Sequence, residues 1–464
     1  MDSMTNDVNI VGGLIVTAEG SFVGAVGVQG QTISYIGPGH DIPASRRTID
    51  AHGCLVMPGM VDSHVHVRAP SFAHREDFES ATAAAAAGGV TTLAEMPVSD
   101  PPASDADALR TRVRHAAEHA RIDFCFYGGA GADNLDAIPA LADSGVVGFK
   151  TFLMPPPEGR EREFYGLCAP DEISLEQVLR AAGKEGLFVA VHAEDPETIA
   201  GETRAVQASS VKGLDAFAMS RPPRTELIAV ERVIRAQKRT ESRVLICHVS
   251  TPEAVDRIRE AKAEGSKIYA ETCPQYLLLS QDVVRSHGPF ARVKPPIRSE
   301  ALREGLFQRF HNGWIDILSS DHAPYRLEEK ERGLENIWLA PDGIPALELS
   351  LPLMLEKALS GELEYEQVVR HFSENPARLL GIYPRKGALR EGSDADLVVV
   401  EPGAPRPVIL DSMWTKARQS CKVYEGWTIR HHIRITLCRG RVVFENGDIR
   451  GDPGMGALVT PVQH

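Results

Sequence analysis

The sequence predicts an α/β fold: a (β/α)8 TIM barrel with a small β-sandwich domain formed by both termini. Between Val56 and Pro376, short apolar strands alternate with amphipathic helices. This alternation gives about eight strand–helix units, which is the scale of a (β/α)8 barrel with some long loops. The segments on either side of this region are instead short β-rich runs punctuated by glycine. The chain of 464 residues is long enough for both parts.

The two β-rich end segments are expected to form one domain, because neither is long enough to bury a core alone. Their expected strands are Asn9–Thr17, Val23–Val28, Ile33–Ile36, Asp396–Val400, Ile433–Cys438 and Arg441–Glu445. We therefore assign residues 1–55 and 381–464 to the sandwich, and residues 56–380 to the barrel.

The barrel region contains eight expected strands, each a short apolar run. They begin near Leu55, Thr91, Phe124, Val147, Phe188, Arg243, Lys267 and Ile315. Helical spacing of apolar residues marks the segments between them. The expected helices are Glu76–Ala87, Asp105–Ala120, Leu175–Lys184, Glu226–Lys238, Glu253–Ala263 and Glu300–Phe310. An open doubly wound sheet is the competing architecture, but no GxGxxG motif follows an early strand.

The composition excludes several classes of protein. The net charge of −13 argues against a general binder of nucleic acid or anionic membranes. No apolar run approaches the roughly 18–20 residues that span a bilayer. The seven cysteines contain no CxxC pair, so a reduced, cytoplasmic protein is expected.

Polar side chains that suit a metal ion end several of the expected strands, where barrels of this kind carry their active groups. They are His64, His66, Lys150, His192, His248 and Asp321. His64 and His66 share a face because alternate strand residues do so. Each residue alone has an ordinary structural interpretation, such as a hydrogen-bonded histidine. Burying all six costs free energy unless each polar group has a partner. Imidazole and carboxylate together suit Zn²⁺, Mn²⁺, Co²⁺ or Fe²⁺ as that partner.

Longer motifs surround these residues along nearly the whole chain. They are Pro58–His66, Gly88–Thr92, Glu271–Pro274, Ser320–Pro324, Asn375–Arg378 and Gly392–Leu397. In these motifs the chain resembles the amidohydrolase superfamily, and within it the cyclic-amide branch of dihydroorotases, allantoinases and hydantoinases. The resemblance also implies a β-sandwich assembled from both termini and a homo-oligomer, either a dimer or a tetramer.

The resemblance implies a binuclear metal centre with Zn²⁺ as the first choice of metal. Lys150 would be carbamylated by CO₂, because a free ammonium group has no lone pair to offer a cation. The implied ligands are His64, His66 and Asp321 for one metal, and His192 and His248 for the other. A hydroxide shared by the metals would attack a ring amide, with Asp321 as general base. Nothing in this scheme needs an organic cofactor.

Four further residues are candidates for binding a small cyclic amide: Arg68, Val98, Lys294 and Tyr325. In dihydroorotases an arginine at the place of Arg68 grips the substrate carboxylate, which a guanidinium suits. If the strand continues, Arg68 shares a face with His66. Dihydroorotases carry asparagine, asparagine and histidine where this chain has Val98, Lys294 and Tyr325, so the chain departs from their pattern around the ring.

These observations favour hydrolysis of a ureide, imide or lactam ring, with a carboxylated, dihydroorotase-like ring preferred because of Arg68. The alternatives are an allantoinase and a hydantoinase or imidase. Hydantoinases carry a tyrosine shortly after the lysine, whereas Thr151–Pro157 contains none. A non-catalytic scaffold relative is a third hypothesis, but such relatives lose metal ligands and all six remain. Hydrolysis of an ester or phosphotriester is a fourth, which the metal ligands alone do not exclude.

Overall fold

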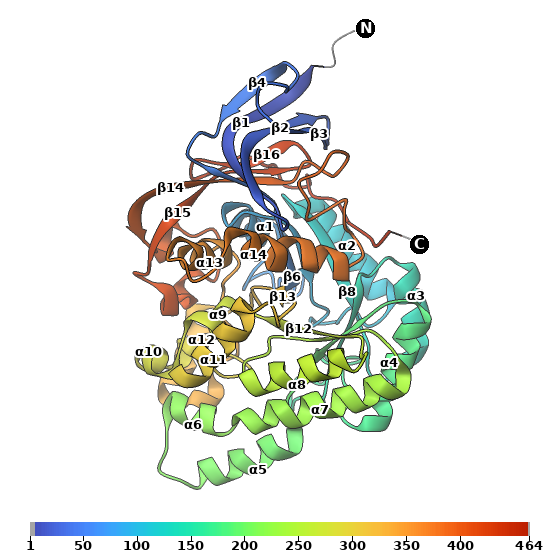
Figure 1. Ribbon diagram of the computed structural model, residues 1–464. Helices are drawn as coiled ribbons and strands as arrows, with labels where there is room; N and C mark the ends of the chain where they lie inside the picture. The colour runs from blue at the N-terminus through green and yellow to red at the C-terminus, as the bar shows by residue number, and fades with distance from the viewer. Residues whose placement is uncertain (1–4, 463–464) are drawn as a thin grey trace.

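The computed structural model describes residues 5–462 and confirms the expected fold class. A near-closed barrel of eight parallel strands adjoins a separate, mostly antiparallel sheet built from both ends of the chain (Figure 1). The first four and last two residues of the expected terminal segments lie outside the described residues. The barrel strands are β6 (Met60–Val65), β7 (Val90–Glu95), β8 (Asp123–Gly129), β9 (Gly148–Phe152), β10 (Val189–His192), β11 (Val244–Ile246), β12 (Ile268–Thr272) and β13 (Ile317–Leu318).

The barrel strands neighbour one another in chain order, from β6 to β13. Contacts just beyond the two end strands bring the edges together. His66 N donates to His322 O at 2.8 Å, and Val65 pairs with His322 in a parallel bridge. The residues that follow β6 and β13 are therefore direct neighbours at the carboxyl end of the barrel.

The terminal sheet has nine strands among the described residues. They are β1 (Asn6–Val16), β2 (Ser21–Gln29), β3 (Thr32–Gly37), β4 (Ser45–Asp50), β5 (Leu55–Pro58), β14 (Leu397–Pro407), β15 (Thr428–Cys438), β16 (Arg441–Glu445) and β17 (Asp448–Ile449). Strand β5 joins the two halves of this sheet, since it pairs with β1 on one side and with β14 on the other.

The expected start of the first barrel strand near Leu55 is wrong. Leu55–Pro58 belongs to the terminal sheet, and the barrel begins only at Met60. Gly59 is the joint between the two sheets, where a Cβ atom would lie 2.1 Å from Thr91 Oγ1. The apolar run continues through this joint, so hydrophobicity alone gives no sign that the chain changes sheets.

Helices surround the barrel (Figure 1). They are α1 (Phe78–Ala87), α2 (Ala106–His119), α3 (Ile138–Asp143), α4 (Glu172–Lys184), α5 (Pro196–Gln207), α6 (Gly213–Met219), α7 (Pro223–Thr240), α8 (Pro252–Ala263), α9 (Pro274–Leu278), α10 (Gln281–Val284), α11 (Glu300–His311), α12 (Leu327–Glu335), α13 (Ser350–Leu359), α14 (Tyr365–Val369) and α15 (Asn375–Leu379). The six expected helices correspond to α1, α2, α4, α7, α8 and α11.

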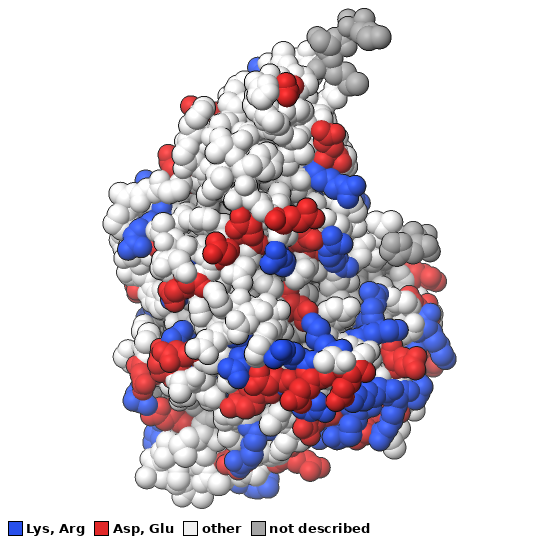
Figure 2. Space-filling view, viewed as in Figure 1, with Lys and Arg blue, Asp and Glu red and all other residues white. Residues whose placement is uncertain are grey.

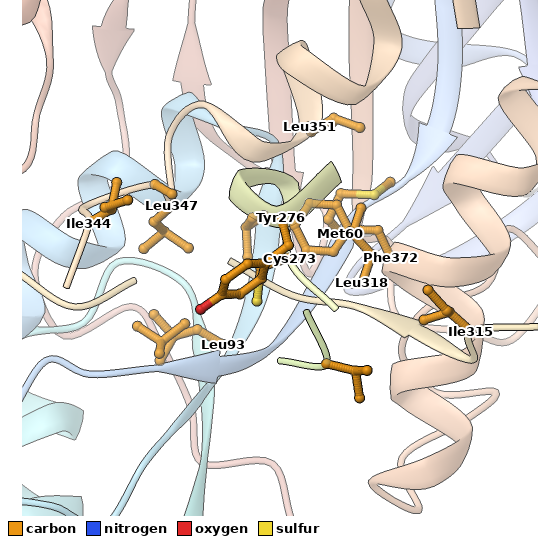
Figure 3. Packing of buried hydrophobic residues seen from close by; sticks show 14 of the residues in the cluster. Met60, Leu93, Cys273, Tyr276, Ile315, Leu318, Ile344, Leu347, Leu351 and Phe372 are labelled. Atoms are coloured by element: carbon orange, nitrogen blue, oxygen red, sulfur yellow. The ribbon is translucent and has the colours of Figure 1, made fainter. Parts of the chain in front are cut away.

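The strands are held by one large buried apolar cluster, part of which is shown in Figure 3. In it Met60 and Leu93 from neighbouring strands pack together with Leu318 of β13, Tyr276 of α9 and Phe372. Close packing of this kind resists small displacements. The cluster therefore gives the strand ends a rigid base from which to present polar side chains.

Charged side chains of both signs are interspersed on the face shown in Figure 2, which carries α7 and α8. In the last turn of α7, Arg239 contacts both Glu172 and Glu176, and Lys238 contacts Glu264. Within residues 5–462, no helix is both long and apolar enough to cross a membrane.

Candidate metal centre

The structure brings the six candidate ligands to one cavity of about 490 Å³ at the carboxyl end of the barrel. Strand β6 carries His64, with His66 just beyond it, and β9 and β10 carry Lys150 and His192. His248 follows β11, and Asp321 follows β13. Strand ends fix these backbones, so the side chains converge before any ligand binds.

His64 and His66 both reach the Asp321 carboxylate. Their Nε2 atoms lie 3.5 Å and 3.4 Å from Asp321 Oδ1. His64 Nε2 is buried and forms no hydrogen bond with any of residues 5–462. An orphaned imidazole nitrogen beside a buried carboxylate oxygen fits a divalent cation, and one donor atom from each of the three residues lies within 4.8 Å of the others.

The local electrostatics favour a positive charge beside His64. Burial opposes protonation of this imidazole, but the charges of Glu271 and Asp321 outweigh burial and raise the His64 pKa to about 10. The pKa of His66 is lowered to about 3, mainly by burial. A cation placed between these groups would be stabilised by the same carboxylates that raise the pKa of His64.

His192 and His248 form a second pair of ring nitrogens. His192 Nδ1 lies 3.0 Å from His248 Nε2, and both rings are buried. Burial lowers the pKa of each imidazole below its ordinary value. Both rings are therefore neutral at physiological pH, which is the form that binds metal ions.

Lys150 is buried without a carboxylate partner. Only 1% of the residue is exposed, and its Nζ atom donates to Cys247 Sγ at 3.0 Å. Among the described residues no Asp or Glu oxygen forms an ion pair with it within 4.0 Å. An unpaired ammonium in such a place is costly, so the site suits a lysine that does not remain a simple ammonium ion.

Three residues of the site have left-handed backbone conformations without being glycine. The φ angles are 37° at His248, 46° at Asp321 and 59° at Arg68. Such conformations cost energy for residues with a side chain and cluster at functional sites. Surrounding contacts must hold these three backbones in place.

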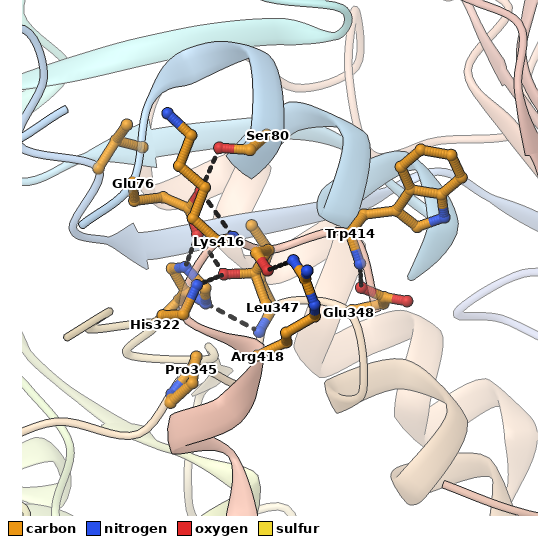
Figure 4. Close-up of polar contacts among 12 residues, drawn as sticks. Glu76, Ser80, His322, Pro345, Leu347, Glu348, Trp414, Lys416 and Arg418 are labelled. Atoms are coloured by element: carbon orange, nitrogen blue, oxygen red, sulfur yellow. Dashed lines mark hydrogen bonds and ion pairs between the residues drawn. The ribbon is translucent and has the colours of Figure 1, made fainter. Parts of the chain in front are cut away.

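The segment beyond Asp321 is anchored by a polar network shown in Figure 4. His322 Nε2 lies 3.5 Å from Glu76 Oε2, and His322 Nδ1 accepts from Leu347 N at 3.3 Å. Glu76 in turn accepts from the hydroxyl of Thr415 and from the backbone of Lys416. Residues from the C-terminal part of the chain thus help to fix the loop that carries Asp321.

All four candidate substrate-binding residues line the same cavity. Arg68 NH1 donates to the Tyr325 hydroxyl at 2.6 Å, and Lys294 Nζ lies 2.8 Å from Asp342 Oδ2. Val98 belongs to an apolar cluster with Phe152 and Phe164. The strand does not continue to Arg68, because β6 ends at Val65 and Arg68 has a left-handed backbone conformation. Arg68 nevertheless lines the cavity.

Arg68 and Tyr325 form a buried polar pair. Burial raises the pKa of the Tyr325 phenol, but the charges of Arg68 and Arg160 outweigh this effect and lower it overall. Arg68 Nε is buried and has no hydrogen-bond partner among the described residues. The pair therefore includes one buried donor without a partner among the described residues.

Sequence reasoning missed two carboxylates that contact the histidines. Glu271 Oε1 lies 2.7 Å from His64 Nδ1, and Glu194 Oε2 lies 2.9 Å from His192 Nε2. Glu194 could have been found from the sequence, since it follows His192 by two residues just beyond the end of β10. Glu271 stood in one of the motifs that carry the resemblance, but its contact with His64 could not be predicted because the two residues are distant in the chain.

A (β/α)8 barrel with histidines, a lysine and an aspartate at its strand ends is the arrangement expected of a metal-dependent hydrolase. The model of the amidohydrolase family matches residues 55–443. This chain belongs to the amidohydrolase family, in which a binuclear metal centre is general, and within it to the hydrolases that act on C–N bonds of cyclic amides.

Several characterised proteins are similar over most of their length. L-hydantoinase of Paenarthrobacter aurescens is 35% identical over 422 residues, 90% of each chain. An allantoinase of Streptomyces avermitilis is 36% identical over 447 residues, 95% of this chain and 96% of the relative. A dihydroorotase of Halobacterium salinarum is 35% identical over 405 residues, 86% and 88% of the two chains.

Solved structures agree with this assignment. The L-hydantoinase (dihydropyrimidinase) from Arthrobacter aurescens superposes with a TM-score of 0.94 and 33% identity, covering 98% of this chain and all of that one. The D-hydantoinase (dihydropyrimidinase) from Thermus sp. has a TM-score of 0.88 and 27% identity, covering 98% and 99%. The likeness therefore extends through both the barrel and the terminal sheet.

Proposed function

We propose that this protein opens a small cyclic amide by hydrolysis at a binuclear metal centre, with Asp321 as the general base. The observation that carries the proposal is the convergence of the six candidate ligands on one cavity, with Asp321 Oδ1 within 3.5 Å of two imidazole nitrogens. All six ligands are present, which favours an enzyme over a scaffold relative.

The donor set divides into two groups. His64, His66 and Asp321 suit one ion, and His192 and His248 suit the other. A carbamate on Lys150 would turn a buried, unpaired amine into an oxygen ligand for both. When bound, ions such as Zn²⁺ supply a water of lowered pKa and polarise a carbonyl oxygen.

The protein side chains then handle the proton. The Asp321 carboxylate would accept the proton of the attacking water and pass it to the departing ring nitrogen. The Oδ1 atom of this carboxylate lies within 3.5 Å of the Nε2 atoms of both His64 and His66, so the position of the carboxylate does not depend on the substrate. A fixed acceptor next to the reacting atoms contributes by orientation as well as by basicity.

Arg68 supports a ring that carries a carboxylate. Its guanidinium is buried beside the metal ligands, forms no ion pair with an acidic residue among those described, and has the unused donor Nε. Lys294 is a weaker candidate for a second charge, because Asp342 already neutralises it. Val98 gives the ring an apolar neighbour. This combination favours an anionic substituent on one side and a less polar edge on the other.

A neutral hydantoin is the second candidate. Trp338, Leu339 and Pro341 line the same cavity, and 59% of Leu339 is exposed. An apolar substituent on a five-membered ring could cover this surface. The similarity to L-hydantoinase over 90% of each chain favours the same substrate class.

A panel of rings tests the proposal directly. Protein purified with added Zn²⁺ and bicarbonate is assayed with dihydroorotate, allantoin, dihydrouracil, cyclic imides and both enantiomers of 5-substituted hydantoins, and its metal is measured by elemental analysis. We expect about two metal equivalents and opening of at least one ring. The proposal would be contradicted if this preparation contained no metal, or if the protein opened none of the rings.

The variant Arg68→Met distinguishes the two substrate classes. For a carboxylated ring this variant should lower kcat/KM by an amount equivalent to about 1.5–3 kcal/mol of transition-state binding, the range of a charge-assisted hydrogen bond. For a neutral hydantoin or allantoin it should change little. If the best ring is neutral and Arg68→Met leaves its kinetics unchanged, the carboxylate assignment fails and the neutral-ring candidate replaces it.

The assembly and location of the protein are further proposals. We expect a homo-oligomer, a dimer or tetramer, which light scattering of the purified protein would test. The seven cysteines are all free and buried, in keeping with a reduced, cytoplasmic protein. Fractionation of the source cells would test this location.

A further inference from the structure

Glu271, on β12, is a fully buried carboxylate in contact with ligands of both proposed metals. Its Oε1 atom lies 2.7 Å from His64 Nδ1 and also accepts from the backbone N–H of His248 at 3.2 Å. The backbone carbonyl of Glu271 accepts from Val249 N at 2.7 Å. One residue thus touches a histidine from each ligand group.

The contact with His64 fixes which ring nitrogen faces the cavity. A carboxylate accepts hydrogen bonds, so the proton of a neutral His64 ring lies on Nδ1. The lone pair is then on Nε2, the orphaned nitrogen 3.5 Å from Asp321. Without Glu271, the ring could rotate or carry its proton on the wrong nitrogen.

The contact with His248 acts through the backbone. His248 has a φ of 37°, a left-handed conformation that a histidine adopts only under constraint. The side chain of Glu271 binds the N–H of His248, and its carbonyl binds the N–H of the next residue. These two bonds hold the turn that presents the His248 ring towards His192.

Glu271 differs from Glu194 in its charge balance. Glu194 pairs with the Arg221 guanidinium as well as with His192. Glu271 has no Lys or Arg ion-pair partner within 4.0 Å among the described residues. A buried carboxylate without a basic partner is costly unless a cation lies close by. The His64 ring is its only ion-pair contact among the described residues, so this carboxylate is committed to a proposed metal ligand.

We infer that Glu271 is a positioning residue shared by both metals, which orients the His64 ring and the His248 backbone together. This inference rests on the ligand groups of the proposed function. It assigns a role to a residue outside the ligand set. It also gives a specific expectation: loss of Glu271 weakens both metals, whereas loss of Glu194 weakens only the metal held by His192.

Metal retention tests the inference in the holoenzyme. Wild type, Glu271→Gln, Glu271→Leu and the control Glu194→Gln are loaded with Zn²⁺ and bicarbonate, dialysed against a graded series of dipicolinate, and analysed for zinc. Glu271→Leu should release both equivalents at about 10–100-fold lower chelator concentration than wild type, the usual effect of removing a residue that orients a ligand. Glu271→Gln retains the acceptor oxygen and should fall between the two.

The control separates the possible failures. Glu194→Gln should release one equivalent early and keep the other. Release of only one equivalent from Glu271→Leu, or retention like that of wild type, would overturn the inference while the proposed function stands. Absence of zinc from wild type would instead overturn the proposed function.

Thermal unfolding in excess chelator excludes a merely structural role. Without metal, Glu271→Gln should unfold close to the wild-type temperature, because its amide can occupy the same space and accept the same hydrogen bonds. The inference would fail if Glu271→Gln lowered the unfolding temperature, relative to wild type, as much without metal as with metal. That result would show that the residue only holds the barrel together.

Discussion

At Asp321, one carboxylate oxygen is shared between two imidazole nitrogens, 3.5 Å and 3.4 Å away. Asp321→Asn keeps this shape and a ligand oxygen but cannot carry a proton at neutral pH. We expect turnover on the best ring of the panel to fall by roughly 10²–10⁴-fold, the usual contribution of a general base. The zinc content and unfolding temperature of the variant serve as controls and should stay near wild type. Wild-type turnover would exclude Asp321 as the proton carrier.

Lys330, which is not one of the proposed metal ligands, should make the stability of the fold depend on pH. Its buried amine donates to the carbonyls of Arg292 and Pro341, each at 3.0 Å. Burial lowers the Lys330 pKa from 10.5 to about 7. Between these two values the unfolded chain binds a proton that the folded protein lacks. Raising the pH from 7 therefore stabilises the fold, by up to about 1.4 kcal/mol per pH unit.

The variant Lys330→Met should remove this dependence. We expect the stability advantage of wild type over Lys330→Met to grow as the pH rises from 7 to 9.5. Below pH 7 both states of wild type are protonated, so the difference should become constant. Unfolding midpoints of the two proteins across pH 6–9.5 measure it, and a difference that does not vary with pH would contradict the shifted pKa.

The side chains that could be predicted from the sequence are those whose position follows from strand geometry. His64 and His66 share a face because they alternate on one strand, and Lys150 ends another apolar run. Glu271 could not be assigned a role in this way, since its contact with His64 joins residues 207 positions apart. The pairing of Lys294 with Asp342 depends on how two loops fold together, which no periodic pattern encodes.

At the scale of elements, strongly amphipathic helices were predictable and short or exposed ones were not. The predicted segment Glu226–Lys238 lies within α7, which buries one continuous face. Helix α5 buries only Val206, so its sequence lacks the apolar stripe that helical periodicity requires. The start of α4 at Glu172 depends on a local contact, the Asp171 carboxylate accepting from Ser174 N at 2.8 Å.

The segment between β9 and α4 forms part of the cavity wall. It lines the cavity with Met154, Pro157 and Phe164, and the rings of Phe164 and Phe152 pack at 5.1 Å. Phe152 and Phe164 belong to a small apolar cluster separate from the main core, and Met154 packs against it.

Phe164→Ala should loosen this segment without unfolding the barrel. The cavity left behind removes the packing that fixes the Val98 side of the pocket. We expect KM for the best ring to rise by about tenfold, equivalent to about 1.4 kcal/mol, with a smaller change in unfolding temperature. Tyr165→Ala is the matched control, because that neighbouring side chain is 53% exposed. Equal effects of the two substitutions would show that packing of the segment does not govern binding.

At the scale of the whole molecule, a buried ionic network joins the barrel to the terminal sheet. Lys386 Nζ lies 2.5 Å from Asp123 Oδ2 and 2.7 Å from Asp396 Oδ2, and Arg439 binds Asp123 from the other side. Asp123 begins β8, whereas Asp396 and Arg439 flank β14 and β15. In the sequence, Gly392–Leu397 was only one of the motifs that carry the resemblance. The structure shows that Asp396 of this motif binds Lys386 in the network between the two sheets.

This network lies at the amino end of β8, opposite to the end that carries the candidate site. Lys386→Met leaves the two buried carboxylates with Arg439 as their only remaining basic partner among the described residues. Breaking a buried ion pair by removing one partner costs about 3–5 kcal/mol. We therefore expect a clear fall in unfolding temperature, while kcat/KM of the folded, metal-loaded enzyme stays near wild type. The control Arg385→Met removes a partly exposed pair with Asp394, worth at most about 1 kcal/mol. A Lys386→Met protein as stable as Arg385→Met would show that this contact does not hold the two sheets together, and loss of kcat/KM at full metal content would show that the network also reaches the site.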